Sequence, residues 1–124
     1  MINDIQISKN FKLSEFECKG GSHQVVVDSE LIEKLQELRD ELGYPLIINS
    51  AYRNKEYNQK VGGSPKSQHL KGTAVDISLN NIPYTADEVE MIAELIGFDG
   101  IGKYDTFVHL DVRGYPARWD ERTK

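Results

Sequence analysis

This sequence has a single cysteine, no excess of basic residues and no long apolar run. Each of these features excludes a class of protein. Cys18 is the only cysteine among 124 residues, so no disulfide framework can form within the chain. The formal net charge is -5 and residues of both signs are interspersed, which argues against the basic stripe of nucleic-acid-binding proteins. We therefore expect no nucleic-acid partner, and we expect Cys18 to be a half-buried, small apolar residue.

Membrane and export signals are missing as well. No apolar run approaches the roughly 20 residues that a membrane-spanning helix needs, so we expect no membrane insertion. The first residues, Met1-Ile2-Asn3-Asp4, lack the basic start and the apolar core of a signal peptide. We expect a chain that is made in the cytoplasm and that reaches a substrate outside the membrane only if another component delivers it.

The length fits one compact domain. A chain of this size buries roughly two thirds of its unfolded surface in one core and leaves no room for a second core. No repeat and no low-complexity linker divides the sequence. We predict a single domain over residues 1–124, and we expect it to be a monomer.

Two segments carry the signals of amphipathic helices. In residues 29–42 four leucines recur at helical spacing, with Asp28 before them as a cap and Gly43 after them as a stop. In residues 86–96 apolar residues recur in the same way after a capping box that starts at Thr85. We predict that both helices pack an apolar stripe on the core.

The predicted strands are short. Residues 45–52 read as a buried strand, residues 73–79 as a strand with alternating faces, and residues 100–104 and 107–112 as a hairpin. The first twelve residues are too sparse in apolar positions for a prediction. Two helices and about four short strands are compatible with an α+β domain.

Smaller features complete the outline. We predict a short helix over residues 54–60 and a helical turn over residues 13–16 with Ser14 as its cap. His23 has no neighbours at ligand spacing, which favours a solvated or structural role. In the polar segment after residue 112, Trp119 with Tyr115 and Pro116 is expected to fold back as an anchor.

Two histidines and one aspartate form the strongest functional pattern. Alternation places Asp76 on a strand face made otherwise of small residues, where an unpaired carboxylate would be costly, so this carboxylate needs a cation. His69 precedes it by seven residues, and alternation places His109 on one face of the strand over residues 107–112. Two imidazoles and one carboxylate are a ligand set that catalytic zinc uses when an open position holds water or substrate. We predict one zinc ion at these residues.

Arg53 and Ser67 are the candidate substrate-binding residues. The guanidinium of Arg53 lies at the end of a predicted strand and matches a carboxylate bidentately, which implies a substrate with a free carboxylate. A surface salt bridge is the alternative role for Arg53. Ser67 stands two residues before His69, where its hydroxyl would either bind substrate or shape the loop.

A hydrolytic zinc site also needs a base for the proton of the attacking water. Asp111 and Asp105 both fall on the His109 face of the predicted strand, and we favour Asp111. The alternative for Asp111 is an ion pair with Arg113 or Arg118.

As a set, these residues resemble the zinc D-alanyl-D-alanine carboxypeptidase family of peptidoglycan peptidases, including its phage endolysin relatives that cut the L-alanyl-D-glutamate bond. The similarity covers residues 13–114. It includes Leu13-Ser14-Glu15-Phe16, Ser50-Ala51-Tyr52-Arg53, Ser67-x-His69-x-x-Gly72-x-Ala74-x-Asp76-Ile77 and Phe107-Val108-His109-Leu110-Asp111.

The resemblance implies a fold, a metal and a substrate. The fold would be a small α+β domain, an antiparallel sheet packed by helices, as in lysostaphin-type peptidases and hedgehog signalling domains. His69, Asp76 and His109 would hold the zinc, while Arg53 and Ser67 would contact a peptide of peptidoglycan. The small size and the missing export signal favour a phage or prophage lysis role or a tail-associated role.

One position departs from the family pattern and leaves alternatives open. Many relatives carry a catalytic Glu or Asp three residues before the last histidine, where this chain has Thr106. A zinc-holding binding module without catalysis is therefore the second reading. A third reading, an iron oxygenase that uses His69, His109 and Asp111, fits poorly because such enzymes usually need a many-stranded double-sheet core.

Overall fold

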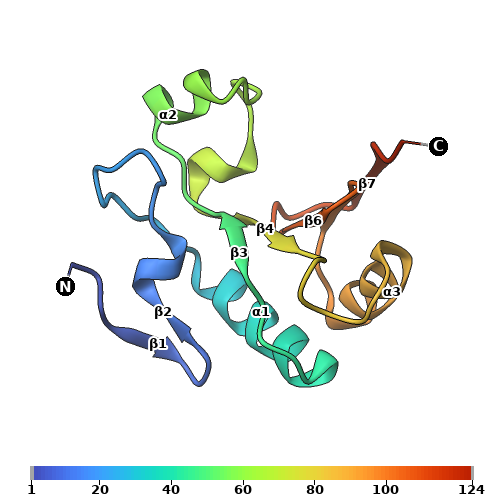
Figure 1. Cartoon of the computed structure of the whole chain (residues 1–124). Coiled ribbons are helices and arrows are strands. Elements are labelled where there is room, and N and C mark those ends of the chain that lie inside the picture. The colour runs from blue at the N-terminus through green and yellow to red at the C-terminus, as the bar shows by residue number, and fades with distance from the viewer. Residues whose placement is uncertain (1, 124) are drawn as a thin grey trace.

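The computed structural model describes residues 2–123, which have an α+β fold built on one five-stranded sheet (Figure 1). Met1 and Lys124, the ends of the predicted domain, lie outside the described residues. The elements in chain order are β1 (Gln6–Ser8), β2 (Phe11–Lys12), η1 (Leu13–Phe16), α1 (Ser29–Leu42), β3 (Ile48–Ser50), α2 (Lys55–Lys60), η2 (Gln68–Lys71), β4 (Ala74–Ser78), α3 (Ala86–Ile96), β5 (Gly100–Lys103), β6 (Phe107–Asp111) and β7 (Ala117–Asp120).

The main sheet has the strand order β3-β4-β6-β5-β7. Its pairs are antiparallel except for β5 and β7, which run parallel. A separate antiparallel pair, β1 and β2, lies near the N-terminus. The predicted α+β class is confirmed, and the sheet has one strand more than the roughly four expected.

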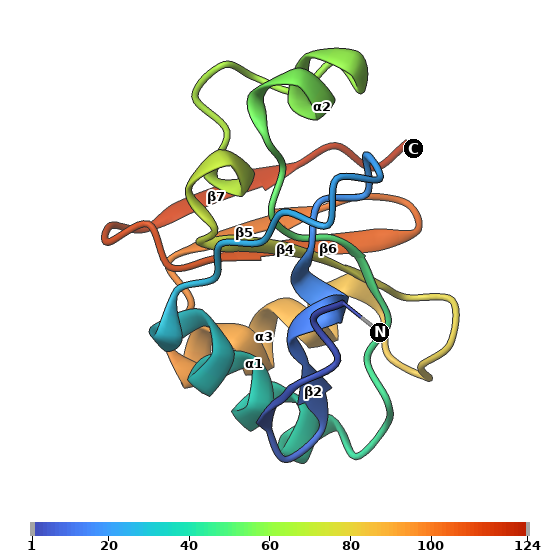
Figure 2. The same cartoon turned by 90° about the vertical axis from the view of Figure 1, so that its left-hand side faces the viewer.

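Helices α1 and α3 cover one face of this sheet, while α2 stands on the other side (Figure 2). The two longer helices match their predicted bounds, and each ends at a glycine with positive φ, Gly43 or Gly97. Leu31, Leu35 and Leu38 of α1 are almost completely buried. Burial of apolar surface contributes roughly 25 cal/mol per Å², so this contact stabilises the fold.

Alternation along the central strands separates an apolar face from a polar one. Val75 and Ile77 of β4 lie in the apolar core, as do Val108 and Leu110 of β6. The intervening residues include Asp76 and His109, which therefore face away from α1 and α3. Asp76 and His109 are also direct partners in the β4–β6 register, so the sheet itself brings them together.

Several element predictions are wrong in detail. The strand expected over residues 45–52 covers only Ile48–Ser50, and the pairing of β3 with β4 is irregular there. The cap of η1 is Lys12 instead of Ser14, because the Lys12 backbone N–H donates to Glu15 at the start of the turn. Strands β1, β2 and β7 were not predicted.

Other expectations are confirmed. The hairpin of β5 and β6 forms, and α2 lies within its expected range. Trp119 folds back onto the sheet through β7. Cys18 is more deeply buried than expected, at 2% exposure. His23 is exposed, with Nδ1 3.0 Å from a carboxylate oxygen of Glu17.

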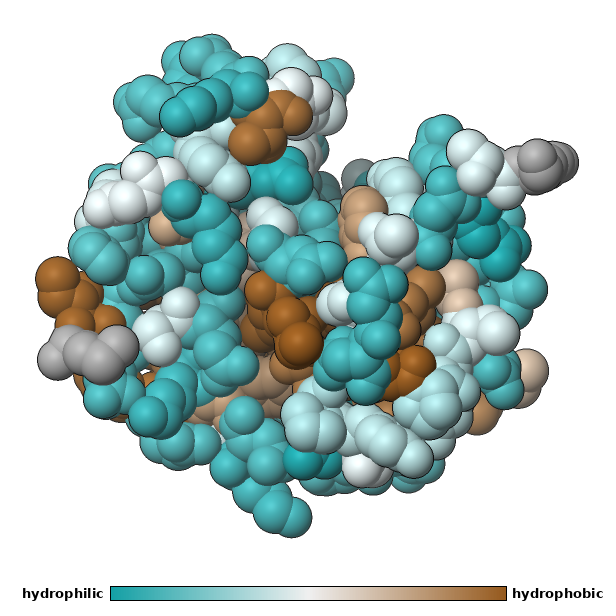
Figure 3. Space-filling view, viewed as in Figure 1, coloured by the Kyte–Doolittle hydropathy of each residue, from teal (hydrophilic) through white to brown (hydrophobic). Residues whose placement is uncertain are grey.

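The molecular surface is mostly hydrophilic on the face seen in Figure 3, and a hollow separates the lobe that contains α2 from the C-terminal strand. Among residues 2–123, no helix combines the length and the apolar character needed to cross a bilayer.

Candidate metal centre

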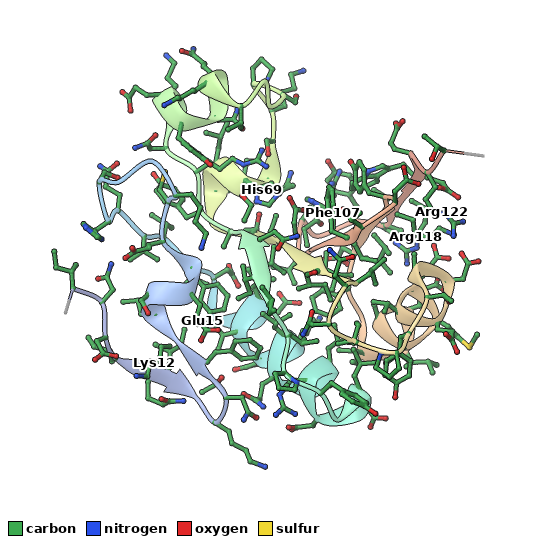
Figure 4. The ribbon with its side chains drawn as sticks, in the orientation of Figure 1. Lys12, Glu15, His69, Phe107, Arg118 and Arg122 are labelled. Carbon is green, nitrogen blue, oxygen red and sulfur yellow. The ribbon has the colours of Figure 1, made fainter. Side chains whose placement is uncertain are left out.

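A cavity of about 710 Å³ lies between the segment that follows α2 and the polar face of the sheet. One wall is formed by the loop over residues 61–67. The other wall carries four aromatic side chains, those of Tyr104, Phe107, Tyr115 and Trp119. Figure 4 labels His69, which belongs to η2, and Phe107, the first residue of β6, and both line the cavity.

His69, Asp76 and His109 meet in this cavity, and all three are buried. Nε2 of His69 lies 3.2 Å from Oδ1 of Asp76, and Nδ1 of His109 lies 3.1 Å from the same oxygen. One ligand atom from each residue lies within 4.8 Å of the others. The structure therefore brings together the three residues that the sequence singled out.

His69 is held by η2 and by the chain segment after β3. The hydroxyl oxygen of Ser67 accepts a hydrogen bond from the His69 backbone N–H, which fixes the first turn of η2. Nδ1 of His69 lies 2.7 Å from the carbonyl oxygen of Ala51, so Nδ1 must carry the hydrogen. In the neutral ring, Nε2 is then the free acceptor and faces Asp76.

His109 is held in the complementary way. Its Nε2 lies 2.7 Å from Oδ2 of Asp111, so Nε2 carries the hydrogen and Nδ1 faces Asp76. Asp111 has no exposed surface and accepts further hydrogen bonds from the Gly100 backbone N–H and from Arg113. A carboxylate behind a histidine in this manner is typical of metal-binding imidazoles.

The charges at the centre favour a cation. Burial alone would raise the pKa of Asp76, but His109 and His69, when their rings are protonated, donate to this carboxylate, outweigh burial and hold its pKa well below its ordinary value. Burial lowers the pKa of His109, but hydrogen bonds to Asp111 and Asp76 outweigh burial, so the pKa of His109 is raised above its ordinary value. With both rings neutral, two nitrogen lone pairs would face one carboxylate oxygen, so a proton or a metal ion must lie between them.

Positive groups surround this centre. Arg53, Lys66 and Arg113 line the cavity, and within residues 2–123 Asp76 is the only carboxylate that does so. Nη2 of Arg53 lies 3.7 Å from Oδ2 of Asp76. The cavity is therefore suited to a ligand that carries negative charge.

Arg53 is fixed from two sides. Its Nε donates to the Ser50 hydroxyl at 3.2 Å, and its Nη1 donates to Oδ1 of Asn58 at 3.2 Å. Asn58 is 2% exposed, and its amide nitrogen donates to the Ser64 carbonyl in the cavity loop. The guanidinium is thus held in a set direction within the cavity, and it is not a free surface charge.

The two candidate bases lie elsewhere. Asp105 is exposed in the turn between β5 and β6, where its carboxylate accepts hydrogen bonds from the backbone and hydroxyl of Thr123. Asp111 is buried behind His109 and forms an ion pair with Arg113, which is the alternative that the sequence left open for it. Neither aspartate lines the cavity. Thr106 is exposed in the same turn as Asp105.

Sequence reasoning missed part of the cavity wall. Lys66, Arg113 and Tyr104 were not predicted to face the centre, and Trp119 and Tyr115 were expected only as an anchor. Trp119 and Tyr115 reach the cavity because β7 pairs in parallel with β5. The available signal was the cluster of aromatic residues in the β5–β6 hairpin and in the segment that follows β6, since aromatic side chains often line binding cavities.

Comparison with known proteins agrees with this geometry. The family described as Peptidase M15 matches residues 9–111, most of the chain. No curated protein matches the chain. M15 peptidases are zinc-dependent, and the buried group of two histidines and one aspartate has the ligand types that zinc prefers. The chain belongs to the peptidase M15 family, which implies that it is a metallopeptidase.

Proposed function

We propose that this protein is a zinc-dependent peptidase that hydrolyses a peptide bond in the stem peptides or cross-links of peptidoglycan, as a D-alanyl-D-alanine carboxypeptidase or an endopeptidase of endolysin type. One observation carries the proposal. Nε2 of His69 and Nδ1 of His109 both face the same oxygen of Asp76 in a cavity lined by cationic side chains.

The three residues would hold one zinc ion. Bound there, zinc supplies a Lewis acid for the scissile carbonyl and lowers the pKa of an attacking water. His69 and His109 need no rearrangement to act as ligands, because Ala51 and Asp111 already fix which ring nitrogen is free. The ionised Asp76 contributes the negative charge.

Arg53 would bind a carboxylate of the peptide. Its fork can take a carboxylate bidentately, and the bonds to Ser50 and Asn58 hold it in place beforehand. Peptidoglycan peptides contain D-alanine termini and acidic residues, so they offer such carboxylates. Ser67 lines the cavity as well, but its hydroxyl oxygen also accepts from the His69 backbone, which supports the role of shaping the loop.

The contacts of Asp111 support a different role from the base we favoured. Its two oxygens are occupied by His109, Gly100 and Arg113, and it has no exposed surface from which to reach a water. We assign Asp111 to the positioning of His109. Asp105 is held by Thr123 outside the cavity, which argues against its acting as the base.

The second candidate is a zinc-holding binding module without catalysis. It is favoured by the absence of any carboxylate other than Asp76 among the described residues that line the cavity. Such a module would bind one zinc ion and a peptide and leave peptidoglycan intact.

The proposed site of action follows from the proposed substrate. Peptidoglycan lies outside the cytoplasmic membrane, so the protein would act there after delivery, as a phage or prophage lysis or tail-associated protein does. We propose that it works as a monomer, since the described ligands all come from one chain.

Incubation of the zinc-loaded protein with purified peptidoglycan, followed by mass analysis of the soluble products, tests the proposal. Release of free D-alanine would identify a carboxypeptidase, and a cut at the alanyl-glutamate or cross-link bond would identify an endopeptidase. His69→Ala is the matched control and should release neither. Stoichiometric zinc without any released product would favour the binding module.

A further inference from the structure

The wall of the cavity formed by β5, β6 and β7 carries a hydroxyl group that the proposed function does not use. Tyr104 follows β5 and lines the cavity, and its oxygen accepts a hydrogen bond from Nε1 of Trp119 at 2.9 Å. This inference rests on the proposed function, since it assigns Tyr104 a part in that hydrolysis.

The bond between Tyr104 and Trp119 has a fixed direction. An indole N–H can only donate, so the phenol oxygen is the acceptor. The phenol therefore keeps its own hydrogen for a second partner. Because an oxygen that accepts one hydrogen bond becomes a stronger donor through its own hydrogen, Trp119 strengthens the donor that Tyr104 offers.

Trp119 also links Tyr104 to the metal centre. Gly102 pairs with His109 on one side and with Trp119 on the other, so the three positions share one face of the sheet. The centroids of the Trp119 and His109 rings lie 4.9 Å apart. A Cβ atom on Gly102 would lie 2.2 Å from the Trp119 ring, so this position needs glycine for the indole to lie across it.

The phenol ring is held on a second side. Its ring stacks on Phe107, with centroids 4.3 Å apart and an interplanar angle of 8°. A ring fixed by stacking and by one hydrogen bond presents its hydroxyl with little freedom left to lose. By contrast, the guanidinium of Arg113 on the same wall is already paired with Asp111.

We propose that the Tyr104 hydroxyl donates a hydrogen bond to the carbonyl oxygen of the scissile peptide as negative charge develops on it, and that Trp119 is the positioning residue for this hydroxyl. The Tyr104 phenol keeps its proton throughout, so this role involves no proton transfer. The phenol stabilises the charged oxygen from the aromatic wall, in the manner of an oxyanion-hole donor.

Tyr104→Phe tests the proposal, because it removes the hydroxyl and keeps the stacking ring. Loss of one oxyanion donor lowers kcat by about 100-fold to 1,000-fold. With peptides from purified peptidoglycan as substrate, we expect such a loss with KM and zinc content unchanged. Trp119→Phe should give a smaller loss of the same kind. Tyr44→Phe, at an exposed tyrosine outside the cavity, is the matched control.

A binding readout accompanies the rates. A phosphinic analogue of the dipeptide whose bond is cleaved, D-alanyl-D-alanine for a carboxypeptidase or L-alanyl-D-glutamate for an endopeptidase of endolysin type, has a tetrahedral, negatively charged group in place of the scissile bond. The dipeptide itself has a planar group there. Titration calorimetry on the zinc-loaded protein should show that Tyr104→Phe weakens binding of the phosphinic analogue and leaves binding of the planar dipeptide unchanged. Equal affinity of the analogue for both proteins would overturn the proposal.

Two further outcomes separate this inference from the proposed function. Wild-type protein that releases neither D-alanine nor a peptide contradicts the proposed function, whereas an active wild type with an equally active Tyr104→Phe contradicts only the role of Tyr104. If Tyr104→Phe loses zinc or stability, replacement of Tyr104 by 3-fluorotyrosine tests the role of the hydroxyl instead. Binding of the phosphinic analogue is then measured at a pH at which the fluorinated phenol stays protonated. Its stronger donor should tighten binding of the phosphinic analogue, and unchanged or weaker binding would overturn the role.

Discussion

Nε2 of His109 lies 2.7 Å from Oδ2 of Asp111, a carboxylate with no exposed surface. Arg113 closes the other side of this carboxylate, with Nη2 2.6 Å from the same oxygen. Burial raises the pKa of Asp111, but its hydrogen bonds with His109 and Arg113 hold the pKa well below its ordinary value. Asp111 therefore remains ionised and orients the imidazole that faces Asp76.

This relationship predicts the effect of Asp111→Asn. The amide cannot supply the negative charge that polarises His109, so zinc affinity should fall about 10-fold to 100-fold. Competition with a chelator measures this affinity directly. Asp105→Asn is the control, since Asp105 lies in an exposed turn outside the cavity, and it should bind zinc as the wild type does. Wild-type zinc affinity in Asp111→Asn together with lost hydrolysis would restore Asp111 as the base.

Asn58 should affect substrate binding through Arg53. Asn58→Ala removes the acceptor for Nη1 of Arg53, and hydrogen bonds to charged groups contribute about 1.5–3 kcal/mol. We expect KM to rise about tenfold, with a larger rise for Arg53→Ala and little change in kcat in either case. Steady-state kinetics on released peptides provide the measurement.

The control for Asn58 is Asn81→Ala. Asn81 is exposed and its amide donates to the Pro45 carbonyl, on a segment that does not line the cavity. This variant should keep the wild-type KM. A KM that is unchanged in Asn58→Ala would contradict the positioning role of Asn58.

Metal removal should lower the melting temperature. A ligand that binds only the folded protein at about 1,000 times its Kd adds roughly 4 kcal/mol of stability. Calorimetric scans with zinc and with a chelator should therefore differ by roughly 10 °C or more for the wild type. For His69→Ala the two scans should nearly coincide, and an equal shift in that variant would place the zinc elsewhere.

The helix-to-sheet contact should dominate stability. Leu35 of α1 is completely buried, so Leu35→Ala removes apolar contacts and leaves a cavity, at a cost of about 2–5 kcal/mol. Urea unfolding measures this loss. Leu95 of α3 is 84% exposed, so Leu95→Ala is the control and should change stability by less than about 0.5 kcal/mol. Equal losses in both variants would contradict the assigned core.

The sequence predicted what depends on local patterns. Helical spacing and caps defined α1 and α3 to the residue, because apolar periodicity and end signals reinforce one another there. Alternation placed Asp76 and His109 on faces that could meet, and the β4–β6 register makes them direct partners.

Long-range pairing escaped prediction. Strand β7 pairs in parallel with β5, a contact that the polar tail does not signal, and it brings Trp119 to the metal centre. The environment of Asp111 was equally hidden. Alternation predicted the strand face on which Asp111 lies. It did not predict that Gly100 and Arg113 would donate hydrogen bonds to the Asp111 carboxylate.

Hydrolysis by zinc-loaded wild type and by metal-free His69→Ala protein, compared on the same peptidoglycan preparation, tests the central claim most directly. Mass analysis of the released D-alanine and peptides is the readout, with metal content measured on each sample. We expect products from the wild type at one zinc per chain and none from the variant. Full hydrolysis by metal-free His69→Ala would contradict a peptidase that depends on zinc at His69, Asp76 and His109.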